Sequence, residues 1–127
     1  MKSKIFILLI ITVSLNSSLI GQDTKIVVMN MYWAKEGKIE EVHQLRLYAS
    51  EVRKKLGLEV GRVLFNKNTT SISPNVIWEC EYPSIEARNR DVELLSKSTQ
   101  FDEVKEKMNA LVIRFERAVY EISNGNN

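Results

Sequence analysis

The stretch Val76-Ile77-Trp78-Glu79-Cys80-Glu81-Tyr82-Pro83-Ser84 decides the fold, because it contains the end of one element and the start of the next. Apolar residues alternate with Glu79 and Glu81 as far as Tyr82, which predicts a β-strand with two chemically different faces. Pro83 ends the ladder because proline has no backbone N–H to donate. Ser84 is a typical helix N-cap. The stretch therefore predicts a strand over residues 76–82 that leads directly into a helix.

The chain before this stretch predicts two more strands and a long helix. Residues 25–33, KIVVMNMYW, are rich in the β-branched and aromatic residues that favour strands. Residues 38–56 repeat apolar side chains at spacings of three and four, as an amphipathic helix does, and Gly57 is a suitable stop. Residues 60–67 alternate again and are predicted to form a hairpin with residues 76–82.

The chain after Ser84 predicts two helices and a last strand. Apolar residues recur at helical spacing over residues 85–97 and again over residues 101–113. Over residues 115–122 apolar and polar residues alternate, as in a strand. The order strand, helix, strand, strand, helix, strand is the ferredoxin-like βαββαβ arrangement of the α+β class. It predicts a four-stranded antiparallel sheet with helices on one face. A single domain over residues 22–122 is expected, followed by a disordered tail at 123–127.

Alternation along the strands predicts which residues share a sheet face. The more apolar set is expected under the helices: Val27, Met29, Met31, Val63, Phe65, Trp78, Cys80, Ala118, Tyr120 and Ile122. The opposite, mixed set contains Ile26, Val28, Asn30, Tyr32, Arg62, Leu64, Asn66, Ile77, Glu79, Glu81, Phe115, Arg117, Val119 and Glu121. Left in water, this mixed face would expose an apolar patch of several hundred square ångströms, so we expect a partner to cover it.

The N-terminus has the features of a secretory signal peptide. Two lysines precede an uncharged apolar run over residues 5–15, and a polar stretch follows. The run is shorter than the roughly 20 residues that span a bilayer, so no stable membrane span is expected after cleavage. Residues 1–21 are predicted to be removed, by cleavage after Gly21 or alternatively after Ser18. The mature protein is then exported, periplasmic or secreted; a retained anchor is the alternative.

The charge balance of the mature chain gives no support to one class of partner. Loss of residues 1–21 removes two of the 18 basic residues and none of the 16 acidic ones, which leaves the chain formally neutral. This balance gives no reason to expect a nucleic acid partner. Cys80 is the only cysteine, so no internal disulfide forms. It is expected to be a small buried residue between Trp78 and Tyr82 rather than a reactive thiol.

The pattern of the whole mature chain resembles the dimeric α/β-barrel superfamily, which includes antibiotic-biosynthesis monooxygenase-like and NIPSNAP-like domains. The resemblance lies in the first strand, the helix that begins EGKIEEV, the VIWECEYPS strand, the helix with LLSKSTQFDEV and the final strand with AVYEI. It implies a homodimer in which two sheets pack face to face, with a cavity for a small ligand within the barrel or between sheet and helices.

The same resemblance argues against haem, and the residues argue against a metal. Haem-degrading members combine an asparagine on the first strand with a tryptophan and a histidine on the second helical segment. Asn30 matches the first of these, but residues 85–110 contain neither tryptophan nor histidine. His43, the only histidine, is expected on the surface of the first helix without the further ligands that a metal site needs. No metal and no cofactor are therefore expected.

Polar and charged residues of the mixed face are the candidate cavity residues: Asn30, Tyr32, Arg62, Glu79, Glu81 and Arg117. Paired carboxylates in a partly dry cavity can act as acid or base, and arginines can hold an anionic substrate. The alternative, which we favour, is that these charges form salt bridges across a dimer contact. No catalytic residue is assigned.

Three functions remain open. The first is an exported homodimer that binds a small apolar or amphipathic molecule. The second is a cofactor-independent monooxygenase or isomerase, like some members of the superfamily, which would use a shaped cavity more than a fixed catalytic set. The third is a purely structural or partner-binding domain.

Overall fold

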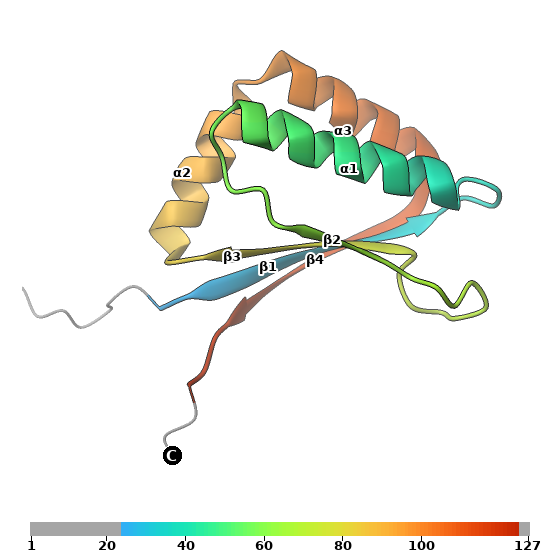
Figure 1. Cartoon of the computed structure of the whole chain (residues 1–127), viewed down its shortest axis with the longest axis horizontal. Helices are drawn as coiled ribbons and strands as arrows, with labels where there is room; N and C mark the ends of the chain where they lie inside the picture. The colour runs from blue at the N-terminus through green and yellow to red at the C-terminus, as the bar shows by residue number, and fades with distance from the viewer. Residues whose placement is uncertain (1–23, 125–127) are drawn as a thin grey trace, which may run out of the picture.

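The fold was taken from a computed structural model, which describes residues 24–124; the predicted signal peptide and the end of the predicted tail lie outside the described residues. The elements are β1 (Ile26–Ala34), α1 (Ile39–Lys55), β2 (Arg62–Phe65), β3 (Val76–Tyr82), α2 (Ile85–Ser96), α3 (Thr99–Leu111) and β4 (Val112–Glu121). The strands form one antiparallel sheet in the order β2-β3-β1-β4. Figure 1 shows all three helices on one face of this sheet and the other face open. The predicted ferredoxin-like fold class is confirmed.

The ends of the helices follow the local signals in the sequence. Gly57, with φ +72°, follows α1, and the backbone N–H groups of Gly57 and Leu58 bond to the carbonyls of Lys54 and Arg53. This pair of bonds is the Schellman ending that favours glycine. Ser84 caps α2, as predicted, by accepting a hydrogen bond from the Ala87 N–H at 3.0 Å. Ser98 caps α3 in the same way, which separates the second helical segment into two helices.

The strand register corrects the predicted faces of β1 and β4. Asn30 lies opposite Trp78 on β3 and opposite Arg117 on β4, so these three residues share the helix-covered face. Ile26 and Val28 are 3% and 2% exposed, beneath the helices rather than on the open face. The covered set is therefore Ile26, Val28, Asn30, Tyr32, Val63, Phe65, Val76, Trp78, Cys80, Tyr82, Phe115, Arg117, Val119 and Glu121. The faces of β2 and β3 are as predicted.

The open face carries the residues that alternate with this covered set. Val27, Met29 and Met31 of β1 lie there, beside Glu81, Glu79 and Ile77 of β3. Leu64 of β2 lies opposite Ile77, and Tyr120 of β4 lies opposite Val27. The open face is thus still partly apolar, although with other members than the sequence pattern predicted.

The core lies between α1 and the centre of the sheet. Val42 and Val52 of α1 are fully buried, as are Val76 and Tyr82 of β3. Val42, Val76 and Tyr82 belong to a cluster that continues to Met108 on α3. The helices cover the sheet incompletely on the side of β4. Phe115 and Val119 face the helix layer there and are still 44% and 42% exposed.

Several element boundaries differ from the prediction, among them those of β4 and β2. β4 begins at Val112 rather than Phe115, because α3 ends at Leu111 and the chain enters the strand without a loop. β2 covers only residues 62–65 of the predicted 60–67, and it begins at Arg62 because Gly61 takes φ +67° immediately before it. In the described part of the chain, no helix combines the length and apolar character needed to cross a membrane.

Candidate functional site

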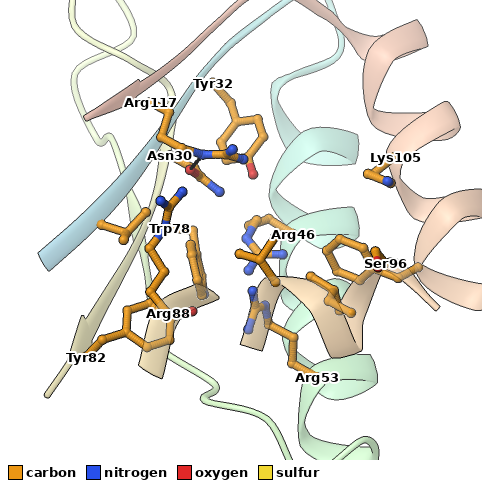
Figure 2. Close-up of a pocket in the computed structure, with 14 residues that line it drawn as sticks. Asn30, Tyr32, Arg46, Arg53, Trp78, Tyr82, Arg88, Ser96, Lys105 and Arg117 are labelled. Carbon is orange, nitrogen blue, oxygen red and sulfur yellow. Dashed lines mark hydrogen bonds between the residues drawn. The ribbon is translucent and has the colours of Figure 1, made fainter. Parts of the chain in front are cut away.

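A pocket of about 240 Å³ lies between the helices and the covered face of the sheet, on the side of β4. Its apolar walls come from Val28 and Trp78 of the sheet, Val92 and Leu95 of α2 and Phe101 of α3. Its polar lining consists of Asn30, Tyr32, Arg46, Arg53, Tyr82, Arg88, Ser96, Lys105 and Arg117. Figure 2 shows these side chains converging from both layers. Five of them are cationic residues, and among residues 24–124 no carboxylate lines the pocket.

Trp78 forms the floor on which two arginines of α1 stack. Its indole N–H donates to the Val60 carbonyl at 2.8 Å, which fixes the plane of the ring. The Arg46 and Arg53 guanidinium carbons lie 4.8 Å and 4.5 Å from the ring centroid, within cation–π range. Figure 2 shows both side chains pointing from α1 toward the tryptophan.

Arg53 is neutralised by an acid from α2. Its Nη1 lies 2.8 Å from Asp91 Oδ1 and donates also to the Glu59 carbonyl at 3.0 Å. The Tyr82 hydroxyl donates to the same Asp91 oxygen at 3.0 Å. Burial of Tyr82 raises the pKa of its phenol, so this hydroxyl keeps its proton and remains a donor. Arg53, Asp91 and Tyr82 thus form a buried, charge-balanced network.

Arg46 has no such acid. It is only 3% exposed, its Nε has no hydrogen-bond partner, and no carboxylate within residues 24–124 pairs with it. Burial is the main reason that the pKa of Arg46 falls to about 10, which still leaves it charged at neutral pH. A desolvated cation–π contact gains about 2 kcal/mol. Burial of an unpaired ion costs several kcal/mol, so stacking on Trp78 does not by itself offset the burial of this charge.

Arg117 forms the opposite wall of the pocket. Its Nε donates to Asn30 Oδ1 at 2.8 Å, across neighbouring strands, and Tyr32 packs against Phe115 with ring centroids 5.2 Å apart. The pKa of Arg117 is lowered, first by burial and then by the charge of Arg88 on α2. Both arginines line the pocket. Arg117, Asn30 and Tyr32 are the three predicted cavity residues that do line the pocket.

The other three predicted cavity residues lie on the open face of the sheet. Arg62 and Glu79 face each other across β2 and β3 and form an ion pair of 2.8 Å. Glu81 lies 3.8 Å from Lys25 at the end of the same face. The sheet separates these carboxylates from Asn30 and Arg117, so the six predicted residues do not form one constellation. Both acids pair with cations of the same chain, whereas the favoured interpretation placed such salt bridges across a dimer contact.

Cys80 and His43 do not belong to the pocket. Cys80 is 2% exposed, as predicted, and burial raises the pKa of its thiol to about 11, so it is protonated and unreactive at neutral pH. His43 is less exposed than predicted, because its ring stacks on Phe65 with centroids 4.1 Å apart. Among the described residues, no group of three His, Cys, Asp or Glu side chains is placed to hold a metal.

Sequence patterning missed the two arginines of α1. The sequence pattern assigned no role to Arg46 or Arg53, yet both are buried. Their spacing contained the signal, because Val42, Arg46, Ala49 and Arg53 follow one another at steps of four, three and four. Such steps keep residues on one helix face, so arginines within an apolar stripe indicate a buried charge site.

Comparison with known proteins shows the fold. No family model matches the chain, and no curated protein matches its sequence. Among solved structures, a dimeric protein of ferredoxin-like fold from Bacteroides fragilis is 12% identical, with 77% of this chain and 96% of that one covered and a TM-score of 0.59. A NIPSNAP family protein from Agrobacterium tumefaciens is 18% identical (81% and 90% covered, TM-score 0.62).

A third similar structure is SnoaB from Streptomyces nogalater, a cofactor-independent oxygenase. It is 11% identical, with 80% of this chain and 95% of that one covered and a TM-score of 0.57. These proteins include the kinds named in the resemblance, and they confirm it at the level of the fold.

Proposed function

We propose that this chain, which shares its fold with dimeric ferredoxin-like, NIPSNAP and cofactor-independent oxygenase proteins, is an exported homodimer that binds a small amphipathic molecule. The binding site is the pocket between the sheet and the three helices. The observation that carries the proposal is the lining of this pocket, where apolar walls and a few convergent polar groups meet in one cavity, as in small-molecule sites generally.

The homodimer is proposed from the open face of the sheet. This face carries Met29, Met31 and Ile77 together with the more exposed Leu64 and Tyr120, which are 38% and 56% exposed. A patch of this kind on a sheet is typical of a protein interface. The similar protein from Bacteroides fragilis is described as dimeric, which supports the same assembly here. The pocket lies on the other side of the sheet and stays accessible in such a dimer.

Blocking the pocket tests the proposed binding. Ser96 lines the pocket from α2 and is exposed, so Ser96→Trp should fill the cavity without disturbing the core. Asn89→Trp, elsewhere on α2 and outside the pocket lining, is the matched control. Native mass spectrometry should detect a bound small molecule in the purified wild type and in the control, and lose it in Ser96→Trp. The probes 2-naphthoate and 2-naphthamide, when added, should bind to the wild type and to the control but not to Ser96→Trp. Equal occupancy in all three proteins, or none in the wild type, would refute the site.

An oxygenase or isomerase is the second candidate function. It is favoured by the fold shared with SnoaB and by a partly apolar pocket with Asn30 and Tyr32 in its wall. Oxygen uptake with a panel of quinols tests it, with Ser96→Trp as the blocked control. Glu79 is not a suitable target for this test, because it lies on the open face. Turnover that persists in the blocked variant would place any such activity outside the pocket.

A further inference from the structure

The charge of the pocket does not balance within residues 24–124. Arg46, Arg53, Arg88, Lys105 and Arg117 line it. Two of these have acidic partners in the described part of the chain: Arg53 pairs with Asp91 in the interior and Lys105 pairs with Asp102 at the surface. Three arginines remain without a carboxylate, and they approach the cavity from α1, α2 and β4.

A comparison of Arg46 with Arg53 shows where in the pocket the unpaired charge lies. Both are buried to the same degree and both stack on Trp78 at nearly the same distance. They differ in that a carboxylate neutralises Arg53, whereas no carboxylate of the described residues neutralises Arg46. Stacking on tryptophan therefore does not replace a counterion, because Arg53 stacks in the same way and is still paired with a carboxylate. Buried cations are normally paired, so the unpaired guanidinium in the pocket wall marks where an anion belongs.

We propose, building on the binding function proposed above, that the ligand is an organic anion whose acid group pairs with Arg46 inside the pocket. The planar guanidinium matches a carboxylate or similar acid group in two-point contact. Arg117 is a second donor, because its Nε is held by Asn30 and its Nη groups make no ion pair in the described chain. Trp78, Phe101 and Leu95 then contact the apolar body of the ligand.

Acid and amide pairs of the same shape test this inference. The pairs are 2-naphthoate with 2-naphthamide and decanoate with decanamide, titrated by calorimetry at neutral pH into the wild type, Arg46→Met and Arg46→Lys. Arg90→Met is the control, since Arg90 is an exposed arginine of α2 outside the pocket lining. In the wild type and Arg90→Met, the acid of at least one pair should bind at least tenfold more tightly than its amide. Arg46→Met should reduce this preference to about onefold, and Arg46→Lys should keep part of it.

Thermal melting provides a second readout that does not depend on the choice of probe. Without ligand, Arg46→Met should melt at a higher temperature than the wild type, because it removes an unpaired buried charge. Arg53→Met should melt lower, because it leaves Asp91 unpaired. Arg46→Met melting as far below the wild type as Arg53→Met does would overturn the inference, since Arg46 would then be a structural residue.

The outcomes separate the two proposals. If the amides bind as tightly as the acids in the wild type and Ser96→Trp abolishes the binding of both, the pocket binds small molecules. The inference that its ligand is an anion would then be wrong. If neither acids nor amides bind and no molecule copurifies, the binding function itself is wrong. An acid preference that is equal in Arg46→Met and the wild type also overturns the role of Arg46.

Discussion

Arg53 of α1 and Asp91 of α2 form an ion pair of 2.8 Å that is buried at both ends, with side chains 4% and 7% exposed. Asp91 Oδ1 also accepts from the Tyr82 hydroxyl, and its Oδ2 accepts from the Glu59 backbone N–H at 3.2 Å. One carboxylate thus connects α2 to α1, to β3 and to the segment before β2. The pocket is built on this connection, because Arg53 and Tyr82 line it.

Replacing Asp91 with alanine should destabilise the protein by about 3–5 kcal/mol, because the change leaves the Arg53 charge buried and unpaired. Urea unfolding measures the loss. In the double variant Asp91→Ala/Arg53→Met the unpaired charge is gone, so the double variant should be more stable than Asp91→Ala alone. Strictly additive losses would show that the two residues do not act as a pair.

Gly61→Ala should be much more harmful than Gly37→Ala. Both glycines have positive φ, near +67° and +75°, so both substitutions incur backbone strain of about 1–2 kcal/mol. An added Cβ at Gly61 would also lie 2.6 Å from Trp78 Nε1 and from the Glu79 carbonyl, whereas at Gly37 it meets nothing within 4 Å. Overpacking adds about 1–3 kcal/mol at Gly61 only. Urea midpoints of the two variants check this, and equal midpoints would contradict it.

The stability of the wild type relative to Cys80→Ala should fall as the pH rises from 9 toward 11. The Cys80 thiol has its pKa raised by burial from an ordinary value of 9.0 to about 11. Between these values the unfolded chain loses the thiol proton while the folded chain keeps it, and this difference favours unfolding. Below pH 9 the contribution of the thiol is fully present. Urea unfolding of both proteins from pH 8 to 10.5 tests the trend, and a constant difference would contradict it.

Ile77→Lys should dissociate the proposed dimer, and Leu47→Lys should not. Ile77 lies on the open face opposite Leu64, whereas Leu47 is exposed on α1. A lysine buried without a partner at an interface weakens binding by about 2 kcal/mol or more, roughly thirtyfold in the dissociation constant. Sedimentation at tens of micromolar compares the wild type with both variants. A monomeric wild type, or equal behaviour of the two variants, would refute a dimer through this face.

The mature protein should begin near Gln22, after cleavage that follows Gly21. Its N-terminal lysines and short apolar run suit translocation without stable spanning. N-terminal sequencing of the periplasmic or secreted fraction checks the position, and a start at Leu19 would indicate cleavage after Ser18 instead. Recovery of the intact chain, with Met1, from the cytoplasm would falsify the export proposal.

The order of elements was predictable from the sequence because local signals agree with the global fold. The stretch VIWECEYPS forms β3 over the predicted residues, and Ser84 caps α2 as expected. The faces of β1 were not predictable in the same way. Both of its alternating sets are apolar, since Val27 and Met29 alternate with Ile26 and Val28. By its polarity alone Asn30 marks the exposed set, whereas its hydrogen bond with Arg117 allows it to be buried.

The candidate site was only partly predictable for related reasons. β4 is exposed on both sides for most of its length, so its alternation gave no reliable indication of the covered face. Because the sequence pattern assigned the wrong faces to β1 and β4, it placed Arg117 on the same face as Glu79. The two residues lie on opposite faces of the sheet. The pairing of Arg53 with Asp91 joins residues 38 apart in sequence, and no local pattern shows such a contact.

The place of β1 in the sheet also determines how the chain can assemble during synthesis. The first strand to be made pairs on one side with β3 and on the other with β4, where Ile26 lies opposite Glu121. One hydrogen-bonding edge of β1 therefore stays open until the last ten-residue strand has been made. Open strand edges pair readily with other chains, and contacts between distant parts of a chain form slowly. A nascent chain that stops before Val112 would thus have an aggregation-prone edge, and β4 closes that edge.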